Sequence, residues 1–416
     1  MKILALNSGS NSLKFEIVNL QPGDINREGS TEFGQTLLSG SYDNVGKQHG
    51  TFSLLDGAKA LSKEDQDTRD YGHAAELLCD WLSRGEGRRN GVQSFSEIER
   101  VGHRVVHGAD LFDGPAAITE AVIRQIEELE DLAPLHNKSA LEVIRAVRAR
   151  MRESMPMVAS FDTVFHRTIP DSAALYALPP DLAKRHKIRR YGFHGLSHGY
   201  LVRRFAQLTE KDASQMKLVT MHLEGGSSAA AVRNGQSVDT SMGFTPLEGL
   251  VMGTRTGDLD PAIVPYLMRK EKMDPKQADE FLNKECGLKA LSGVSSDTRE
   301  LVPKMAEPQV DLAIDIFCHR VRKYLGAYLA VLGGADAIVL GGGISENTPL
   351  IRERICRDLP WFGIEFDAER NAKVINCEGE ITKPGSRLPV WVIPARENLM
   401  VAHEAAQVSN DAFENR

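Results

Sequence analysis

The chain has 416 residues, of which 42% are hydrophobic and 26% charged, so it can bury the core of a soluble globular protein of about two domains. Its net charge of −7 disfavours nucleic acid or an anionic membrane as the main partner. No apolar run approaches the ~18 residues of a membrane span. Five scattered cysteines without a C-x-x-C pair indicate buried free thiols in a reducing compartment, and we expect a cytoplasmic protein.

The first half of the chain predicts a hairpin, two further strands and a helix. Residues 1–19 read as two apolar, partly alternating runs around the loop NSGSNS, which is typical of a β-hairpin. Residues 97–107 predict a buried strand, and residues 155–161 a strand that ends at Asp162. Asn137 or Ser139 can cap a helix with the stripe Leu141, Ile144, Val147 and Met151. Residues 20–70 are polar and glycine-rich and indicate no chemistry.

The second half of the chain also predicts strands, small-residue loops and helices. Residues 216–232, MKLVTMHLEGGSSAAAV, predict a strand, a small-residue loop and a second strand. Residues 311–332 predict the clearest helix, which Gly333 ends and whose stripe comprises Ile314, Phe317, Val321, Leu325, Tyr328 and Leu332. AIVLGGGISEN predicts a strand, a glycine turn and a helix start, VWVIP the last strand, and ARENLMVAHEAA a final helix.

Two segments, one in each half of the chain, share one sequence pattern. MKILALNSGSNSLKFEIV and MKLVTMHLEGGSSAAAV both place small polar residues between two strands. Such a duplication suggests two related domains. The alternative is two unrelated glycine-rich hairpins.

Three glycine- or serine-rich loops, NSGSNS, HLEGGSS and LGGGISEN, each follow a predicted strand. Glycine lets the backbone approach a ligand, and successive N–H groups form a concave anion site. None of the loops matches G-x-x-x-x-G-K-[ST], and LGGGISEN is not G-x-G-x-x-G. A single such loop is usually only a turn, but three favour a nucleotide phosphate cradle built from two hairpins.

This arrangement resembles the actin-like ATPase superfamily. The ordered segments NSGSNSLKF, GHRVVHG, APLHN, FDTVFH, YGFHGLSH, MGTRTGDLDP, SGVSSDTRE and GGGISEN are similar to the acetate kinase family, from residue 2 to about residue 405. The resemblance implies an α/β fold with two related actin-like ATPase (ribonuclease H-like) domains, residues 1–163 plus 396–416 and residues 164–395. It places ATP in the cleft between them and implies a homodimer formed through the second domain.

The implied reaction is reversible transfer of the γ-phosphoryl group of ATP to acetate, giving acetyl phosphate and ADP. A carboxylate is already ionised at pH 7, so the reaction needs no general base. The obstacle is electrostatic, because an anion attacks a polyanion, and guanidinium groups suit its neutralisation. By resemblance, Arg104 and Arg255 contact the carboxylate and the phosphoryl group, and His194 donates to the transition state. Asp162 completes this catalytic set.

The resemblance also implies residues for the nucleotide and for a metal. The nucleotide and its phosphates are assigned to Asn7, Lys14, His136, His222, Gly225, Gly226, Asp297, Thr298, Arg299, Gly342, Gly343, Ile344 and Asn347. Asn7 and Glu397, with Asp162 nearby, match the positions beside Mg²⁺, for which Mn²⁺ is an alternative. Core histidines, helix caps and helix-start acids are the structural alternatives. His194 and His198 are spaced i, i+4, but no glutamate stands between them as in H-E-x-x-H, which disfavours zinc.

Four residues match the family's apolar pocket for the methyl group of the acid: Val106, Leu135, Phe193 and Pro246. Valine at position 106 leaves little room beyond a methyl group. One methylene is worth only ~1–3 kcal/mol of discrimination. The sequence therefore predicts acetate over propionate, with propionate still accepted.

The chain departs from the family pattern in its loops. HLEGG stands where the family has HLGNG, so Gly225 replaces an asparagine and Glu224 brings a carboxylate beside the phosphates. Glu224 must point away, bind Mg²⁺ or repel the nucleotide. Ser8, Asn11 and Ser345 are further departures. The alternatives left open are a propionate kinase, a pyrophosphate-using enzyme, a phosphatase or ATPase on the same fold, and a filament protein of the actin type.

Overall fold

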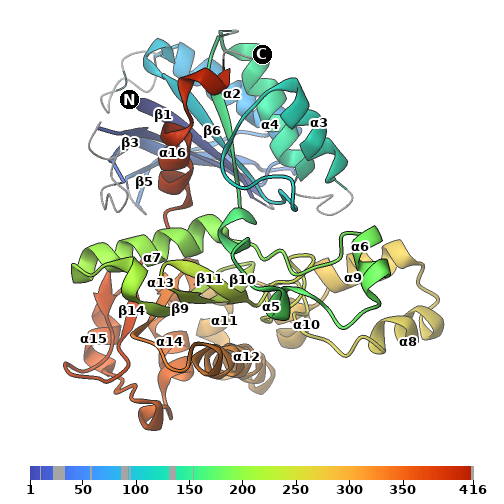
Figure 1. Ribbon diagram of the computed structural model, residues 1–416, viewed down its shortest axis with the longest axis vertical. Helices are drawn as coiled ribbons and strands as arrows, with labels where there is room; N and C mark the ends of the chain where they lie inside the picture. Colours follow the sequence, from blue (N-terminus) through green and yellow to red (C-terminus); the bar gives the residue numbers. More distant parts are fainter. Residues whose placement is uncertain are drawn as a thin grey trace. The chain divides into compact units, whose positions relative to one another are not determined.

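The computed structural model describes residues 1–9, 11–21, 33–56, 59–85, 92, 95–130, 137–152 and 154–413. Two compact units divide the chain: unit 1 is Met1–Val164 with Arg396–Arg416, and unit 2 is Phe165–Ala395. The chain therefore leaves unit 1 once and returns to it near its end (Figure 1). No helix among the described residues is long and apolar enough to cross a membrane.

Unit 1 contains one mixed sheet with the strand order β5-β4-β3-β2-β1-β6-β8-β7. The strands are β1 Lys2–Ser8, β2 Ser12–Asn19, β3 Gln35–Asp43, β4 Thr51–Asp56, β5 Lys59–Asp65, β6 Arg100–Val105, β7 Ala116–Ala117 and β8 Met157–Phe161. The helices are α2 Tyr71–Ser83, α3 Glu120–Glu128, α4 Asn137–Arg150 and α16 Glu397–Gln407.

The predicted N-terminal hairpin is confirmed, because β1 and β2 pair antiparallel with Asn7 opposite Lys14. On its other side β1 pairs parallel with β6, and β6 pairs parallel with β8. Parallel strands bring their carboxyl ends to one edge of a sheet, where ligands bind in open α/β sheets. Asn7, Arg104 and Asp162 lie at this edge because β1, β6 and β8 end there.

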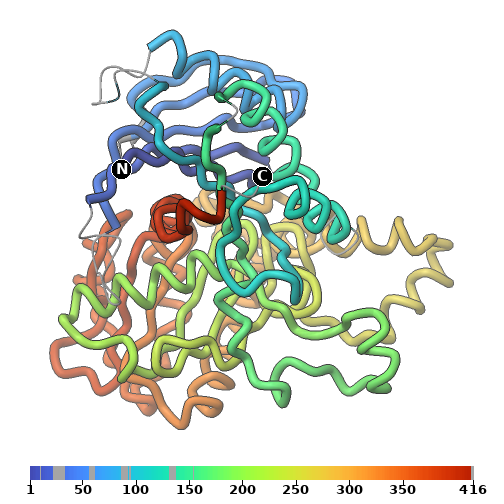
Figure 2. The backbone as a smooth tube through the Cα atoms, turned by 45° about the horizontal axis from the view of Figure 1, so that its top comes forward, coloured from blue at the N-terminus to red at the C-terminus, as the bar shows by residue number. Residues whose placement is uncertain are grey.

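The last helix of the chain, α16, packs on β1 and β6 of unit 1. Figure 2 shows this helix, in dark red, beside the dark-blue N-terminal strands. The approach is close at Gly102, where an added Cβ would lie 2.6 Å from Val401 Cγ1. Glycine at this position therefore permits the contact between helix and sheet.

Unit 2 contains a second mixed sheet with the strand order β11-β10-β9-β12-β14-β13. The strands are β9 Lys217–Leu223, β10 Ser227–Arg233, β11 Gln236–Thr240, β12 Ala337–Gly341, β13 Gly379–Glu380 and β14 Val390–Val392. The helices are α5 Asp171–Ala174, α6 Pro180–Arg185, α7 Gly195–Thr209, α8 Ile263–Lys270, α9 Pro275–Lys284, α10 Gly287–Ser292, α11 Thr298–Leu301, α12 Pro308–Leu332, α13 Gly343–Asn347, α14 Pro349–Cys356 and α15 Ala368–Lys373.

The two sheets share a strand plan. In unit 1 the order β3-β2-β1-β6-β8 joins two antiparallel pairings to two parallel ones, and β11-β10-β9-β12-β14 repeats this in unit 2. The hairpin segments that look duplicated in the sequence occupy the same place in each plan. The prediction of two related α/β domains is therefore confirmed.

Helix α12 forms the centre of the unit 2 core. It begins three residues before the predicted start, and Gly333 ends it with φ 65°. Each residue of the predicted stripe is buried, and burying a large apolar side chain stabilises a fold by ~1.5–3 kcal/mol. The stripe packs against apolar residues of β9, β10, β12 and β14.

Some features of the structure differ from the sequence prediction. Strands β3, β4 and β5 lie between residues 20 and 70, where the sequence analysis predicted no strands, and α2 follows them. The prediction that the cysteines are buried is wrong for Cys377, which is exposed in the bend after α15. Asn137 begins α4 as predicted, but its side chain bonds the backbone N–H and C=O of His107, at 3.0 Å each.

Candidate active site

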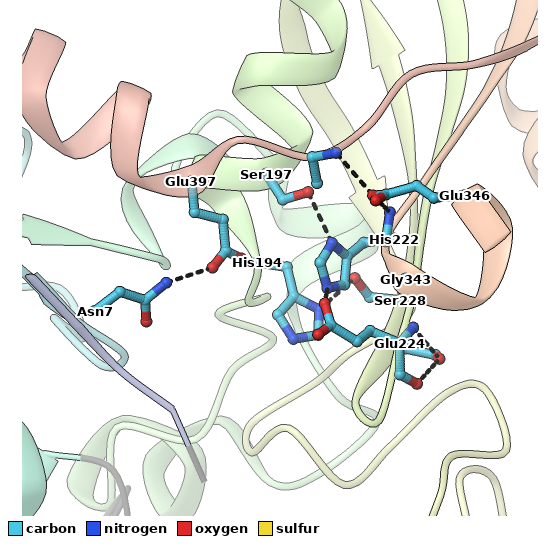
Figure 3. A network of polar contacts seen from close by, with 12 residues as sticks. Asn7, His194, Ser197, His222, Glu224, Ser228, Gly343, Glu346 and Glu397 are labelled. Carbon is cyan, nitrogen blue, oxygen red and sulfur yellow. Dashed lines mark hydrogen bonds and ion pairs between the residues drawn. The ribbon is translucent and has the colours of Figure 1, made fainter. Parts of the chain in front are cut away.

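The strand ends of unit 1 bring four of the predicted site residues together. Arg104 Nε lies 3.0 Å from Asp162 Oδ1 and Nη2 lies 2.5 Å from Oδ2, so the guanidinium binds this carboxylate through two parallel bonds. Arg104 Nη1 donates to Asn7 Oδ1 at 2.9 Å. Asn7 Nδ2 in turn donates to Glu397 Oε2 at 2.7 Å (Figure 3). Glu397 reaches this cluster because it opens α16.

This unit 1 cluster, Asn7, Arg104, Asp162 and Glu397, is mostly buried. The side chain of Asp162 is 0% exposed, that of Arg104 10% and that of Glu397 15%. Arg104 Nη1 also lies 3.7 Å from Glu397 Oε2. Two carboxylates therefore share one guanidinium, and these three side chains together carry one excess negative charge.

The remaining predicted residues of unit 1 are only partly described. Lys14 is an exposed residue of β2 opposite Asn7. Val106 directly follows β6 and is 4% exposed. Leu135 and His136 lie outside the described residues, so their predicted roles stay predictions.

In unit 2, three histidine side chains lie within hydrogen-bond distance of two buried serine hydroxyls. Ser228 Oγ lies 2.9 Å from His194 Nδ1 and 2.8 Å from His198 Nε2. Ser197 Oγ lies 2.8 Å from His222 Nδ1, and the rings of His194 and His222 are 4.4 Å apart between centroids (Figure 3). His194 opens α7 with a left-handed backbone, φ 57°, which directs its side chain toward β9 and β10.

The histidine pair at i, i+4 does not form a metal site in the described residues, where no group of three His, Cys, Asp or Glu side chains could hold a metal ion. His198 is instead bonded through both ring nitrogens, to Ser228 and, at 2.8 Å, to Thr220 Oγ1. Burial lowers the pKa of His198 well below its ordinary value, and the neighbouring His166 and His222 lower it further. The ring is therefore neutral at pH 7.

Arg255 is a cation that only neutral groups hold. Its Nη1 donates to the carbonyl of Pro246 at 3.0 Å, and no salt bridge joins it to a carboxylate of the described residues. Burial lowers the pKa of Arg255 to about 10. A Cβ added to Gly226 would lie 3.6 Å from Arg255 Nη1 and 3.4 Å from His194 Nε2, so these two polar side chains lie on the same side of Gly226.

Glu224, the residue that departs from the family pattern, points toward the glycine loop after β12. Its Oε2 lies 3.5 Å from His222 Nε2, and a Cβ added to Gly343 would lie 3.9 Å from its Cδ (Figure 3). Its side chain is 46% exposed. The carboxylate of Glu224 therefore lies beside the glycine loop, and the three alternatives given for it remain predictions.

The glycine loop itself is shaped by Gly342 and Glu346. Gly342 has φ 85°, and a Cβ there would lie 2.6 Å from the carbonyl of Leu223, so only glycine fits. Glu346 accepts from Gly342 N at 2.7 Å and from Ala395 N at 2.8 Å. Burial raises the pKa of Glu346, although these two N–H bonds oppose the shift.

The other predicted nucleotide residues of unit 2 surround these loops. Asp297 caps α11 and binds Arg299 Nη2 at 2.6 Å, with Arg299 82% exposed and Thr298 buried between them. Asn347 Nδ2 donates to the carbonyl of Gly343 at 3.0 Å. Ile344 is buried, and no heavy atom lies within 4 Å of an added Cβ at Gly225.

Sequence reasoning missed the polar residues that bind the histidines and the glycine loop after β12. Thr220, Ser197, Ser228 and Glu346 are all buried or partly buried and none was singled out. One signal was present: Thr220 and His222 alternate on a strand, and Ser228 pairs with His222 across the hairpin. Residues two apart on a strand face the same side.

Comparisons with known proteins agree along the whole chain. The model of the Acetokinase family matches residues 2–403. A relative named acetate kinase from Solibacter usitatus is 43% identical over 410 residues, covering 98% of each chain. The crystal structure of Porphyromonas gingivalis acetate kinase superposes with a TM-score of 0.85 at 36% identity, covering 97% of this chain and 98% of that one. A propionate kinase from Francisella tularensis superposes with a TM-score of 0.84 at 34% identity, with the same coverage.

Proposed function

Because the chain belongs to the Acetokinase family, we propose that it transfers the γ-phosphoryl group of ATP to acetate in a reversible reaction. A carboxylate oxygen forms a bond to the γ-phosphorus while the bond from that phosphorus to the β–γ bridging oxygen breaks. The products are acetyl phosphate and ADP. No proton is transferred, since acetate is already ionised at neutral pH.

The observation that carries this proposal is that Arg255 forms no salt bridge with any carboxylate among the described residues. A cation held by neutral groups in a partly buried position is costly unless an anion joins it. We propose that a small anionic group binds in a space beside Gly226, Arg255 and His194, which are neighbours in unit 2. We assign this space to the transferring phosphoryl group, whose oxygens accept from Arg255 and from His194 Nε2.

In this proposal the guanidinium of Arg104 binds the substrate carboxylate. Asp162 holds that guanidinium in position. The paired bonds to Asp162 fix the plane of the guanidinium, so little side-chain freedom is lost when a substrate binds. Asp162 has both oxygens engaged and is fully buried, which makes it an anchor for Arg104.

Mg²⁺ fits the donor set of the unit 1 cluster. The cluster contains two carboxylates, Asp162 and Glu397, but one guanidinium, Arg104. Mg²⁺ uses one or two carboxylates and keeps water and phosphate oxygens as its other ligands. Glu397, with Asn7 beside it, would hold the ion, since both oxygens of Asp162 already bind Arg104. When bound, the metal neutralises charge on the phosphate oxygens.

The assignment of acetate, rather than propionate, rests on the names of the relatives and on Val106. Because one structural relative is named a propionate kinase, propionate is the second candidate substrate. The nucleotide residues we propose in unit 2 are His222, Gly225, Gly226, Asp297, Thr298, Arg299, Gly342, Gly343, Ile344 and Asn347. Pyrophosphate is the alternative donor, because Glu224 faces the glycine loop.

We further propose a homodimer formed through unit 2. Helix α8 buries none of its residues within the chain, and its Ile263 and Tyr266 are 37% and 50% exposed. An exposed apolar helix face of this kind is typical of an interface. Light scattering at several concentrations measures the mass, and a monomer at all of them contradicts the proposal.

A hydroxylamine trap tests the function directly. With acetate, ATP and Mg²⁺, acetyl hydroxamate forms only if an acyl phosphate forms, which separates a kinase from an ATPase, a phosphatase or a filament protein. We expect Arg104→Ala and Arg255→Ala each to reduce hydroxamate formation by about 10³-fold or more, as for other arginines that neutralise a transferring phosphoryl group. The same assay with pyrophosphate and propionate distinguishes the alternatives. Phosphate release from ATP without any hydroxamate would contradict the proposal.

A further inference from the structure

A chain of buried hydrogen bonds runs behind His194 in unit 2. Thr220 Oγ1 lies 2.8 Å from His198 Nδ1, His198 Nε2 lies 2.8 Å from Ser228 Oγ, and Ser228 Oγ lies 2.9 Å from His194 Nδ1. Thr220, His198 and Ser228 are 0% exposed. Water therefore cannot replace any link of this chain without a structural change.

The protons in this chain can be counted. His198 is neutral, because burial and two neighbouring histidines lower its pKa, so its ring carries one N–H. Ser228 has one hydroxyl proton, which it can donate to only one of the two histidines. If His198 Nε2 donates to Ser228, then Ser228 donates to His194 Nδ1. If Ser228 donates to His198 Nε2, then His194 Nδ1 must carry a proton of its own.

The surroundings of His194 Nε2 favour the first arrangement. This atom lies on the same side of Gly226 as Arg255, where the proposed anion binds. An anion accepts from an N–H group and repels a nitrogen lone pair. A neutral His194 ring donates to the anion only if its Nδ1 is the acceptor. That arrangement requires the hydroxyl of Thr220 to donate to His198 Nδ1.

We propose that Thr220, His198 and Ser228 are positioning residues that hold His194 as its Nε2–H tautomer, with the N–H directed at the phosphoryl space. The inference rests on the function proposed above, because the anion expected beside His194 Nε2 decides between the two arrangements, but the tautomer is measured without any assay of activity. The hydrogen bonds also hold His194 in its left-handed backbone conformation, which is unfavourable for a residue other than glycine.

The tautomer is measured on the ligand-free, full-length protein. Two-bond ¹H–¹⁵N correlation spectra of ¹⁵N-histidine-labelled protein distinguish Nδ1–H, Nε2–H and doubly protonated rings, and His194→Asn assigns the signal. We expect His194 and His198 both to be Nε2–H at pH 7.5. A His194 ring protonated at Nδ1 overturns the proposal, whatever the activity of the protein.

The variants Ser228→Ala and Ser228→Thr separate positioning from structure. Loss of the hydroxyl should give His194 a mixture of tautomers and lower kcat by about 10- to 100-fold, as for other partners behind an active-site histidine. The KM for acetate should stay within about twofold, because Ser228 touches no substrate in this proposal. Ser228→Thr keeps the hydroxyl and should restore both the tautomer and most of kcat.

Ser237→Ala is the matched control. Ser237 Oγ lies 2.8 Å from His166 Nδ1, so this variant also deletes a fully buried serine–histidine bond of unit 2. We expect a loss of stability with the tautomer of His194 unchanged. If Ser228→Ala and Ser237→Ala lower kcat equally and neither alters the His194 signal, Ser228 has only a structural role.

Failure of this inference and failure of the proposed function give different results. A wild-type protein with the Nε2–H tautomer but no acetyl hydroxamate contradicts the function and leaves the tautomer assignment intact. A wild-type protein that makes acetyl hydroxamate with His194 protonated at Nδ1 contradicts only the inference.

Discussion

The two units hold their active-site arginines in opposite ways. Arg104 of unit 1 is bound to Asp162 through two parallel hydrogen bonds and lies 3.7 Å from Glu397. Arg255 of unit 2 is held by the carbonyl of Pro246 and lacks a salt bridge to any carboxylate that the structure describes. The same strand plan therefore supports one charge-compensated arginine and one uncompensated arginine.

This difference indicates two uses of the same side chain. Compensation by Asp162 makes Arg104 a rigid part of the folded protein, whose orientation is fixed before a ligand arrives. Burial without compensation leaves Arg255 with unsatisfied charge, which an arriving anion can stabilise. The stability of the ligand-free protein should therefore depend mainly on Arg104. The affinity for an anionic ligand should depend mainly on Arg255.

Matched substitutions test this contrast most strongly. Arg104→Met removes the guanidinium that binds the buried carboxylate of Asp162 through two hydrogen bonds, so we expect a loss of ~3–5 kcal/mol in the free energy of unfolding. Arg255→Met removes a buried unpaired charge and should leave the ligand-free stability unchanged or raise it. Urea denaturation followed by tryptophan fluorescence measures both, with Trp81 reporting on unit 1 and Trp361 and Trp391 on unit 2.

An anion provides the second half of that test. Sulfate should raise the melting temperature of the wild-type protein and of Arg104→Met more than that of Arg255→Met. Equal stabilisation of the wild type and Arg255→Met by sulfate would remove the distinction between the two arginines.

Acid should destabilise unit 2 more steeply than unit 1. Burial lowers the pKa of His103 in unit 1 to about 3 and that of His166 in unit 2 to about 4, and it also lowers the pKa of His198. These folded-state pKa values lie below the unfolded value, so the stability is present above pH ~6.5 and is lost as pH falls toward the folded values. Each histidine contributes a slope of ~1.4 kcal/mol per pH unit.

Between pH 6.5 and 5 we therefore expect ~2 kcal/mol of loss from His103 and ~4 kcal/mol from the pair in unit 2. Urea midpoints at several pH values, read from the tryptophans of each unit, measure the two slopes. Equal slopes in the two units would contradict the assignment of two buried neutral histidines to unit 2.

Val106 of unit 1 should set the preference among acids. Val106 directly follows β6, two residues after Arg104, and its side chain is buried. We expect acetate to be favoured over propionate in kcat/KM and Val106→Ala to narrow that preference by about tenfold, within the ~1–3 kcal/mol that one methylene is worth. Val105→Ala, on the opposite side of the strand, is the control and should not change the ratio.

Glu224 of unit 2 gives the smallest predicted effect. Its carboxylate is partly exposed and lies near Gly343, where it repels an incoming phosphate by about 1 kcal/mol. Glu224→Gln should therefore lower the KM for ATP by about two- to fivefold. Glu353→Gln changes an exposed acid of the same unit and is the control. A KM for ATP that rises in Glu224→Gln would indicate that the carboxylate assists binding.

The fold could be predicted where one segment carries its own pattern. The hairpin of residues 1–19 and the helix over residues 311–332 were identified because glycine turns and apolar stripes are local signals. Strands β3 to β5 were not, because their stability depends on packing between distant residues. Phe52 of β4, for example, stacks on Phe15 and Tyr42, with centroids 6.1 Å and 4.6 Å away.

The site was predictable only in part, for the same reason. Arg104, Asp162, Asn7 and Glu397 were identified through family motifs, and the structure brings them together. The bonds of His194 and His198 to Ser228 depend on how α7 packs on β9. From their i, i+4 spacing alone, the two histidines suggested a metal pair, which the described residues do not form.

The position of α16 has a consequence for biosynthesis. This helix belongs to the last 20 or so residues of the chain, yet it covers β1 and β6 of unit 1. During translation, the strands made first must wait for the carboxyl-terminal segment to leave the ribosome, whereas unit 2 is contiguous in sequence and can complete earlier. A nascent chain released before α16 would expose the apolar face of its first sheet and become a substrate for chaperones or proteases.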